Sequence, residues 1–293
     1  MAKFKIQPHF RLQEWIAVEK GYFKDEGLEY DWHHMVTPQD LSGHDTANKY
    51  GAFQTFEDGR KADVSCACHW TVNVAAASGH GKLYADCYSV SPCAIWVPAT
   101  SDIKKPEDLA GVPVSVGFQS GSHYSAIQAL EQFMPLKDIK LDFASGLLYK
   151  RLGHLIDGEI AAASLFSSAY YLAEQLGFRK ICETTFMMAQ MIDGDPDPED
   201  INKYFKALRR AQADLDLRPE LYTKYYKVDM PERFHDVMDV RRWGPGERIV
   251  FEPYSRQIFE DSYDWIAEHD IFEGKDMGVK DYDKAIVSLV AAE

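Results

Sequence analysis

Short apolar runs alternate along this chain with amphipathic segments of helix length, and this alternation restricts the fold more than any other feature of the sequence. Runs typical of strands cover residues 4–9, 28–32, 62–68, 82–88, 95–98, 112–117, 139–143, 161–166 and 180–184. Segments with helical spacing cover residues 12–20, 71–78, 123–133, 147–156 and 169–176. Strands that alternate with helices predict an α/β protein with mainly parallel sheets that the helices cover.

The character of the sequence changes after about residue 193. Asp and Pro residues at 195–199 open a helical pattern over 200–217, and further helical patterns cover 219–227, 254–269 and 282–291. Glycine and proline at 243–247 indicate a loop. We therefore expect the last hundred residues to form a mainly helical region, packed on the first part of the α/β unit.

Two stretches of the sequence echo each other. Residues 58–65 read Asp-Gly-Arg-Lys-Ala-Asp-Val-Ser, and residues 157–164 read Asp-Gly-Glu-Ile-Ala-Ala-Ala-Ser. Each is a turn that leads into a strand, followed by a helix, a glycine and another strand. The echo predicts two similar α/β halves, with chance similarity of short segments as the alternative.

The composition excludes several classes of protein. Of the 293 residues, 46% are hydrophobic, which is enough for the cores of two domains and rules out overall disorder. The formal net charge is −14 and no long basic run occurs, so we expect no nucleic-acid partner. No apolar stretch approaches the roughly 18 residues of a membrane-spanning helix, so direct membrane insertion is not expected.

The cysteines and the start of the chain bear on location. There are five cysteines, an odd and scattered set that does not indicate a disulfide framework. The sequence enters a strand-like pattern at once, without an apolar signal region. As it stands the sequence predicts a cytoplasmic protein, and the alternative is a periplasmic protein whose signal peptide was removed.

The predicted strands lead directly into polar segments that could form one site. In open parallel sheets, ligands bind outside the carboxyl ends of the strands, and two facing sheets form a cleft. Four segments follow predicted strands, namely residues 9–13, 66–70, 119–124 and 166–168. We expect these four segments to line the cleft.

The second segment holds two thiols beside an imidazole and an indole. Alternation along the strand puts Cys66 and Cys68 on the same side, and His69 and Trp70 follow. Either thiol could be a nucleophile with His69 or His123 as its base, and the alternative is that the cysteines are small buried hydrophobic residues. The Cys-x-Cys-His spacing is not usual for structural zinc, so neither a metal nor a cofactor is predicted.

The third segment, Gln119 to Tyr124, is a loop of small residues that opens a helix. Ser122 is expected to cap this helix, and Ser120 and His123 lie beside it. Free backbone N–H groups at a helix start favour a carboxylate, phosphate or sulfonate, with plain capping as the alternative.

The first and fourth segments add two basic side chains and an aromatic ring. His9 and Arg11 follow the first strand, and Arg11 could clamp an anion. The alternative is that Arg11 pairs with Glu14 or Asp63 on the surface. Phe166 could stack on a planar ligand, or it could simply pack.

Four segments resemble the motifs of a known family. Residues 19–23 and 26–28 read Glu-Lys-Gly-Tyr-Phe and Glu-Gly-Leu, residues 103–111 read Ile-Lys-Lys-Pro-Glu-Asp-Leu-Ala-Gly, and residues 158–162 read Gly-Glu-Ile-Ala-Ala. With the helical pattern from Pro198 to Ala213, they resemble the type II periplasmic-binding-protein-like family over about residues 1–225. The branch they resemble contains alkanesulfonate-, nitrate- and thiamine-precursor-binding proteins and thiamine-pyrimidine synthases. Ala161 stands where that family usually has Asp.

The resemblance implies two α/β lobes that close by a hinge on a ligand between them. Lobe one would contain residues 1–93 and 190–293, and lobe two residues 94–189, with crossings near 91–99 and 186–193. Most relatives bind a solute for an ABC importer, whose membrane component would then be a partner of this chain. A minority are enzymes, but the desulfinase's cysteine after the first strand and the synthase's cysteine-rich iron motif are not reproduced here.

Two functions remain in view, and the sequence leaves open whether the protein is an enzyme. The first is binding of a small anionic or planar organic ligand in the cleft, in the manner of a solute-binding protein. Its residues would be His9, Arg11, Trp70, Ser120, Ser122, Tyr124 and Phe166. The second is a cytoplasmic enzyme that uses Cys66 or Cys68 with His69 or His123 for lytic or hydrolytic chemistry on a small aromatic or heterocyclic acid. A ligand-sensing regulatory protein is a third option.

Overall fold

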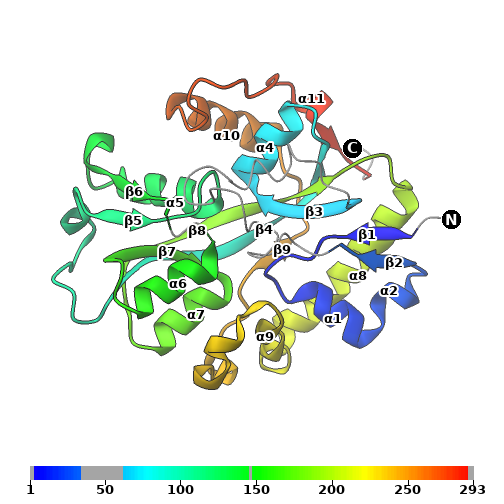
Figure 1. Ribbon diagram of the computed structural model, residues 1–293. Coiled ribbons are helices and arrows are strands. Elements are labelled where there is room, and N and C mark those ends of the chain that lie inside the picture. Colours follow the sequence, from blue (N-terminus) through cyan, green and yellow to red (C-terminus); the bar gives the residue numbers. More distant parts are fainter. Residues whose placement is uncertain (1–2, 34–61, 145–146, 290–293) are drawn as a thin grey trace.

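The computed structural model describes residues 3–33, 62–144 and 147–289, and in these parts the strands form one continuous sheet. The strand order is β2-β1-β3-β8-β4-β7-β5-β6, and β9 and β10 pair with β4 outside this order. Figure 1 shows the sheet crossing the molecule, with helices on both sides. The strand bounds are β1 Phe4–Ile6, β2 Tyr30–Trp32, β3 Val64–Cys68, β4 Lys82–Val97, β5 Pro113–Ser115, β6 Lys140–Asp142, β7 Ala162–Phe166, β8 Arg179–Ile192, β9 Arg248–Val250 and β10 Ile286–Val287.

Each end of the sheet is a parallel three-stranded unit with the same strand order. At one end β1 lies between β2 and β3, and at the other end β5 lies between β6 and β7. A helix follows directly after β3 and after β7, in equivalent positions. This common order agrees with the two similar halves that the sequence echo predicts, although residues 58–61 of the echo lie outside the described residues.

Two long antiparallel strands, β4 and β8, join the halves. They pair along most of their lengths, with register shifts between Tyr84 and Ser89 and between Ile95 and Trp96. The sequence predicts only parts of these strands, because the serines and the proline at 89–92 are typical of a turn. The sheet is therefore parallel at its two ends, as expected, and antiparallel at its centre.

Most helices lie within a few residues of the predicted ranges. Their bounds are α1 Gln13–Lys20, α2 Tyr22–Asp25, α4 His69–Ala77, α5 Gly121–Leu130, α6 Leu148–Ile156, α7 Ser167–Gln175, α8 Pro198–Leu217, α9 Tyr226–Asp229, α10 Arg256–Glu268 and α11 Tyr282–Ala285. The helix ends follow local signals. Gly21 ends α1 in the left-handed conformation at φ 73°, and the Asp197 carboxylate accepts a hydrogen bond from the Glu199 amide at the start of α8.

Two predicted helical segments have a different structure. Residues 219–227 form two 3₁₀ turns, Pro219–Leu221 and Thr223–Tyr225, before the short helix α9. The predicted helix over 282–291 is wrong at residues 286–289, since the chain enters β10 after Ala285 and pairs in parallel with β4, and residues 290–291 lie outside the described residues. The β-branched Ile286 and Val287 suit this strand, so pairing with the sheet overrides the helical spacing.

The C-terminal region packs on the first half, as expected, and also contacts the second. Helix α8 lies against α1 and α2, where Tyr204 and Phe23 stack with their ring centroids 5.9 Å apart, and α10 lies against α4. Between α9 and β9, the indole Nε1 of Trp243 donates to Gln175 of α7 at 2.9 Å. This region therefore connects the two halves in addition to β4 and β8.

We predict that Gly278 is required to dock the end of the chain on α4. Its φ is +75°, and a Cβ atom there would overlap the Ala77 carbonyl, whereas a Cβ at Gly274, with φ +72°, would meet nothing within 4 Å. Gly274→Ala should lower the free energy of unfolding by about 1 kcal/mol, the cost of the left-handed backbone. Gly278→Ala should cost about 1–3 kcal/mol more, because the backbone must shift. Urea unfolding of both variants measures this, and equal losses would contradict it.

Candidate functional site

The loops that follow β1, β3, β5 and β7 meet where the two halves touch. After β1, the carbonyl of Phe10 accepts a hydrogen bond from Oγ of Ser167, which follows β7, at 2.7 Å. After β3, Oγ1 of Thr71 donates to the carbonyl of Gln119, which follows β5, at 2.9 Å. The four segments that the sequence analysis selects therefore lie at one junction.

Aromatic side chains occupy much of this junction. The ring centroids of Phe10 and Phe166 lie 6.3 Å apart, and those of Phe10 and Tyr149 lie 5.8 Å apart. Trp70 and Tyr124 stack at 5.1 Å with 13° between their planes, and both are buried. These two rings pack α4 against α5, whereas Phe10 and Phe166 are only half-buried.

A buried ion cluster is built around Arg11, which is 2% exposed. Its guanidinium donates to both carboxylate oxygens of Glu14, and its Nη1 lies 3.3 Å from Oε1 of Glu247. The hydroxyl of Tyr204 accepts from Arg11 at 3.2 Å and donates to Glu14 at 2.8 Å. Arg11 does pair with Glu14, but in the interior rather than on the surface, because a buried charge needs a partner.

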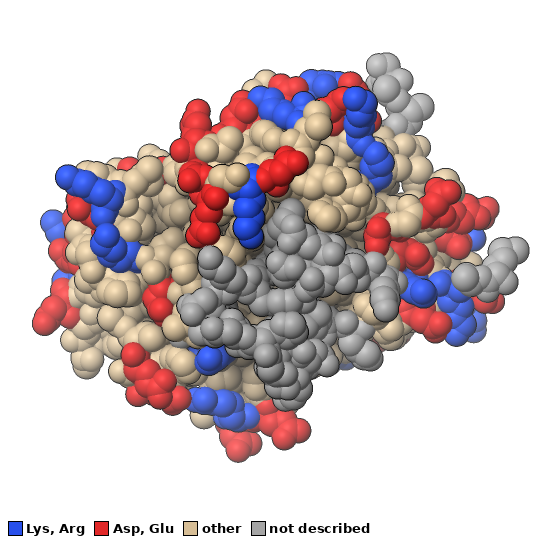
Figure 2. Space-filling view, turned by 45° about the horizontal axis from the view of Figure 1, so that its top comes forward, with Lys and Arg blue, Asp and Glu red and all other residues tan. Residues whose placement is uncertain are grey.

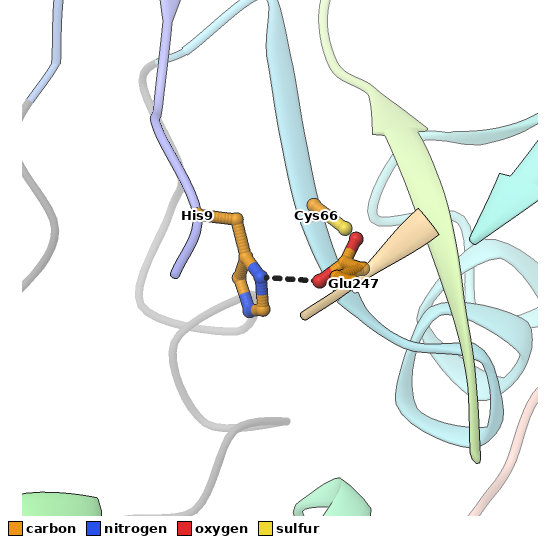
Figure 3. A group of neighbouring side chains, drawn as sticks. All are labelled: His9, Cys66 and Glu247. Atoms are coloured by element: carbon orange, nitrogen blue, oxygen red, sulfur yellow. Dashed lines mark hydrogen bonds and ion pairs between the residues drawn. The ribbon is translucent and has the colours of Figure 1, made fainter. Parts of the chain in front are cut away.

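His9 and Glu247 form a second pair in the same cluster. Nδ1 of His9 lies 3.2 Å from Oε2 of Glu247, and Figure 3 shows the two side chains facing each other next to Cys66. The His9 side chain is 11% exposed and that of Glu247 3%, so His9 is the member closer to solvent. Burial opposes ionisation of Glu247, but the hydrogen bond to His9 and the charges of His9 and Arg11 lower its pKa to about 2.

The two cysteines of β3 have different surroundings. Sγ of Cys66 accepts from Nη1 of Arg11 at 3.7 Å and from Nε2 of Gln190 at 3.6 Å, and such donors favour a thiolate. Sγ of Cys68 lies 3.0 Å from Oγ1 of Thr71, and burial raises the pKa of this thiol to about 11. Of the two predicted nucleophiles, Cys66 has the surroundings that suit one.

Both histidines that the sequence offers as bases are engaged with the backbone. Burial lowers the pKa of His69 to about 4, and its Nδ1 donates to the Met187 carbonyl at 3.0 Å. Burial also lowers the pKa of His123 to about 4, and its Nδ1 accepts from the Gln119 amide at 3.1 Å. His123 then carries its proton on Nε2 and is not a base there, while His69 presents a weakly basic Nε2.

The expectation that Ser122 caps α5 is wrong. The helix begins at Gly121, and Oγ of Ser122 accepts from the Gly117 amide at 2.9 Å and lies 2.9 Å from Oγ of Ser120. Ser120 occupies the cap position, but its hydroxyl donates to the Gly117 carbonyl at 2.8 Å. Ser122 is not the cap because the helix starts earlier than the sequence pattern indicates. Both serine hydroxyls instead stabilise the turn that precedes the helix.

Three helices begin at the junction without a side-chain cap. The cap positions of α4, α5 and α7 are Cys68, Ser120 and Phe166, and none of these side chains makes the capping hydrogen bond to a backbone amide of its helix. Side-chain caps are present on α8 and α10, at Asp197 and Ser255, whereas α1 and α6 also lack one. Because the positive dipole ends of α4, α5 and α7 lie at this junction without side-chain caps, it is favourable for an anion.

Sequence reasoning missed three residues near this cluster: Gln190, Glu247 and Asp229. Gln190 is a polar residue inside the apolar run 187–192, and that contrast is a signal the sequence contains. Glu247 lies in the predicted loop at 243–247, and folding alone brings it to Arg11. Burial raises the pKa of Asp229, at the end of α9, to about 6, although the charge of His9 lowers it.

The surface adds little to the choice of function. In the parts of the chain that the structure describes, no helix is both long enough and apolar enough to span a membrane. On the described part of the face in Figure 2, acidic and basic side chains are intermingled rather than gathered in patches of one sign.

Solved structures share the whole architecture, although no protein-family model matches the chain and a search of the curated proteins finds no significant match. The alkanesulfonate-binding protein SsuA from Xanthomonas axonopodis pv. citri, bound to MOPS, aligns with a TM-score of 0.70 at 14% identity, covering 98% of this chain and 99% of that one. The periplasmic aliphatic sulphonate binding protein SsuA from Escherichia coli aligns at 0.65 with 15% identity, covering 98% of each chain. The desulfurization enzyme DSZB aligns at 0.58 with 10% identity, covering 99% and 97%.

These likenesses define the class of fold. The chain has the type II periplasmic-binding-protein-like fold, as the sequence motifs indicate. Binding proteins and an enzyme both occur among the similar structures, so the fold leaves the choice of function to the site.

We predict that acidification destabilises the protein through its buried neutral histidines. The unfolded chain binds a proton on His69 below about pH 6.5, whereas the folded chain does so only near pH 4. Stability should therefore fall as the pH drops from 6.5 to 4, by about 2–3 kcal/mol for this residue. His69→Asn, which keeps an amide N–H near the Nδ1 position, should reduce the loss in urea unfolding at pH 4.5 relative to pH 7.5. An unchanged difference between these pH values would count against this prediction.

Proposed function

We propose that this protein binds a small organic anion with an aromatic or other apolar part at the junction of its two halves. The observation that carries the proposal is the convergence of three uncapped helix starts, α4, α5 and α7, on one junction. Helix starts at strand ends are a common way for α/β proteins to hold an anion. The sulfonate-binding proteins of the same fold are consistent with such a ligand.

The proposed ligand follows from the groups that remain available at the junction. The Arg11 guanidinium is already bound to two carboxylates, and the hydroxyls of Ser120 and Ser122 bond to Gly117 and to each other, so backbone N–H groups at the helix starts would meet the negative charge. The half-buried rings of Phe10 and Phe166 would cover the apolar part. Trp70 and Tyr124 would act indirectly, by fixing the start of α5 against α4.

A periplasmic location and the membrane component of an ABC importer as partner go with this function. The third option of the sequence analysis, a ligand-sensing regulatory protein, would use the same binding site with a different partner. Opening of the halves to admit or release the ligand would have to break the contacts between Phe10 and Ser167 and between Thr71 and Gln119. Ligand release is therefore expected to be coupled to these two hydrogen bonds.

The second candidate is an enzyme with Cys66 as its nucleophile. It is favoured by the donors on Sγ of Cys66 and by His9, whose ligand nitrogen lies within 4.8 Å of that sulfur. In this alternative His9, held by Glu247, replaces His69 and His123 as the base. Lytic or hydrolytic chemistry on a small aromatic or heterocyclic acid, at a cytoplasmic location, would fit this arrangement.

We predict that organic anions stabilise the protein and that their neutral analogues do not. The probes are benzenesulfonate and benzoate, each compared with its amide, and thermal unfolding is the measurement. A ligand at a hundred times its dissociation constant adds about 2.7 kcal/mol to the free energy of unfolding. Equal shifts with the amides, or no shift with any probe, would contradict the anion site.

Phe166→Ala tests the apolar part of the proposed site. Loss of the ring should weaken binding of both aromatic anions by roughly 10- to 100-fold, because about 1.5–3 kcal/mol of apolar contact is at stake. Phe133→Ala makes the same change at a ring that is 47% exposed and distant from the junction loops in sequence, and it should leave binding unchanged. Each variant is compared with its own ligand-free melting temperature, so that a change in stability is not read as a change in affinity.

A further inference from the structure

We propose that His9, Cys66 and Glu247 bind a divalent transition-metal ion, with zinc as the best match. One potential ligand atom from each of these side chains lies within 4.8 Å of the other two. Figure 3 shows the imidazole, the thiol and the carboxylate gathered at one point, from the segment after β1, from β3 and from the loop before β9. Nitrogen, sulfur and oxygen donors together suit zinc and cobalt(II), whereas magnesium and calcium prefer oxygen alone.

The spacing fits a four-coordinate site with one open position. Zinc–ligand distances of about 2.0–2.3 Å place the ligand atoms of a tetrahedral site about 3.3–3.8 Å apart. Nδ1 of His9 and Oε2 of Glu247 are 3.2 Å apart, so they need little movement to share an ion. His9 is partly exposed and gives an ion access from solvent. Three protein ligands leave a fourth position for water or for a ligand donor.

The charge of the cluster also favours a cation. Arg11 carries one positive charge, while Glu14 and Glu247 carry two negative charges, all buried. The ion pairs of Arg11 with Glu14 and Glu247 therefore leave one negative charge in excess in the interior. A divalent cation bound next to Glu247 would meet this excess charge, and Cys66 would bind it as a thiolate.

The surrounding side chains support the proposed ligands rather than occupy the site. Arg11 makes three nitrogen–oxygen contacts with Glu14 and a 3.3 Å contact with Oε1 of Glu247. The other carboxylate oxygen of Glu247, Oε2, lies next to His9 and therefore faces the proposed ion. Nε2 of Gln190 donates to Sγ of Cys66 at 3.6 Å and orients the thiolate. Outer contacts of this kind hold metal ligands in place and increase their affinity.

Cobalt(II) titration of the untagged, chelator-treated protein tests this inference. It is carried out without any organic anion, so its result does not depend on the proposed ligand. A thiolate bound to cobalt(II) gives a charge-transfer band in the near ultraviolet, and a four-coordinate ion gives intense visible bands. We expect one cobalt ion per chain with both signals, and their loss when zinc is added.

Matched variants assign the site. Cys66→Ser should remove the near-ultraviolet band, whereas Cys68→Ser, two residues further along the same strand and next to Thr71, should keep it. His9→Ala should weaken cobalt binding by about 100-fold or more, since even outer contacts of metal ligands are worth about 10–100-fold.

Three outcomes would overturn the proposal. They are the absence of cobalt binding at millimolar concentration, binding without the thiolate band, and a band that persists in Cys66→Ser. Circular dichroism checks that each variant is folded. If Cys66→Ser does not fold, His9→Ala decides, because an unchanged cobalt dissociation constant in that variant excludes this site.

Discussion

The antiparallel pairing of β4 with β8 is the constraint on which the rest of the structure depends. This pair is flanked by β3 of the first half, which pairs with β8, and by β7 of the second, which pairs with β4, so each half is hydrogen-bonded to one strand of the same central pair. The parallel strands of both halves therefore end toward a common junction, and the loops after β1, β3, β5 and β7 contact one another. The segment between α9 and β9 strengthens this arrangement through its contact with α7.

The junction places an ion cluster in the interior, and the cluster has structural as well as chemical consequences. Arg11 ties the segment after β1 to α1, to α8 and to the loop before β9, through Glu14, Tyr204 and Glu247. Removing one partner from a buried pair usually costs about 3–5 kcal/mol, because the other charge is left unpaired. Arg11 therefore stabilises the fold, and the groups proposed to take part in chemistry are His9 and Cys66, at the edge of the cluster. A metal with an open position and three uncapped helix starts would both favour an anionic guest.

The candidate site was predictable in its location and less so in its chemistry. The rule that ligands bind at the carboxyl ends of parallel strands selects all four segments that meet. The alternation of side chains along β3 predicts the same surroundings for Cys66 and Cys68. In the structure the Cys66 thiol accepts hydrogen bonds from Arg11 and Gln190, whereas the Cys68 thiol lies next to Thr71. That difference comes from β8 and from the segment after β1, which are distant in sequence, so no local pattern contains it.

By itself the sequence determined the alternation of strands and helices, the ends of α1 and α8, and the α/β class of the fold, because these depend on hydrophobic spacing and on local capping residues. The tertiary structure decided where the middle of β4 runs, that residues 286–287 form a strand, and that Glu247 meets His9 and Arg11. The physical reason is that sheet pairing and the burial of charge are settled between segments far apart in the chain. Residue types and their local spacing do not show which distant segment will pair with a strand or neutralise a buried charge.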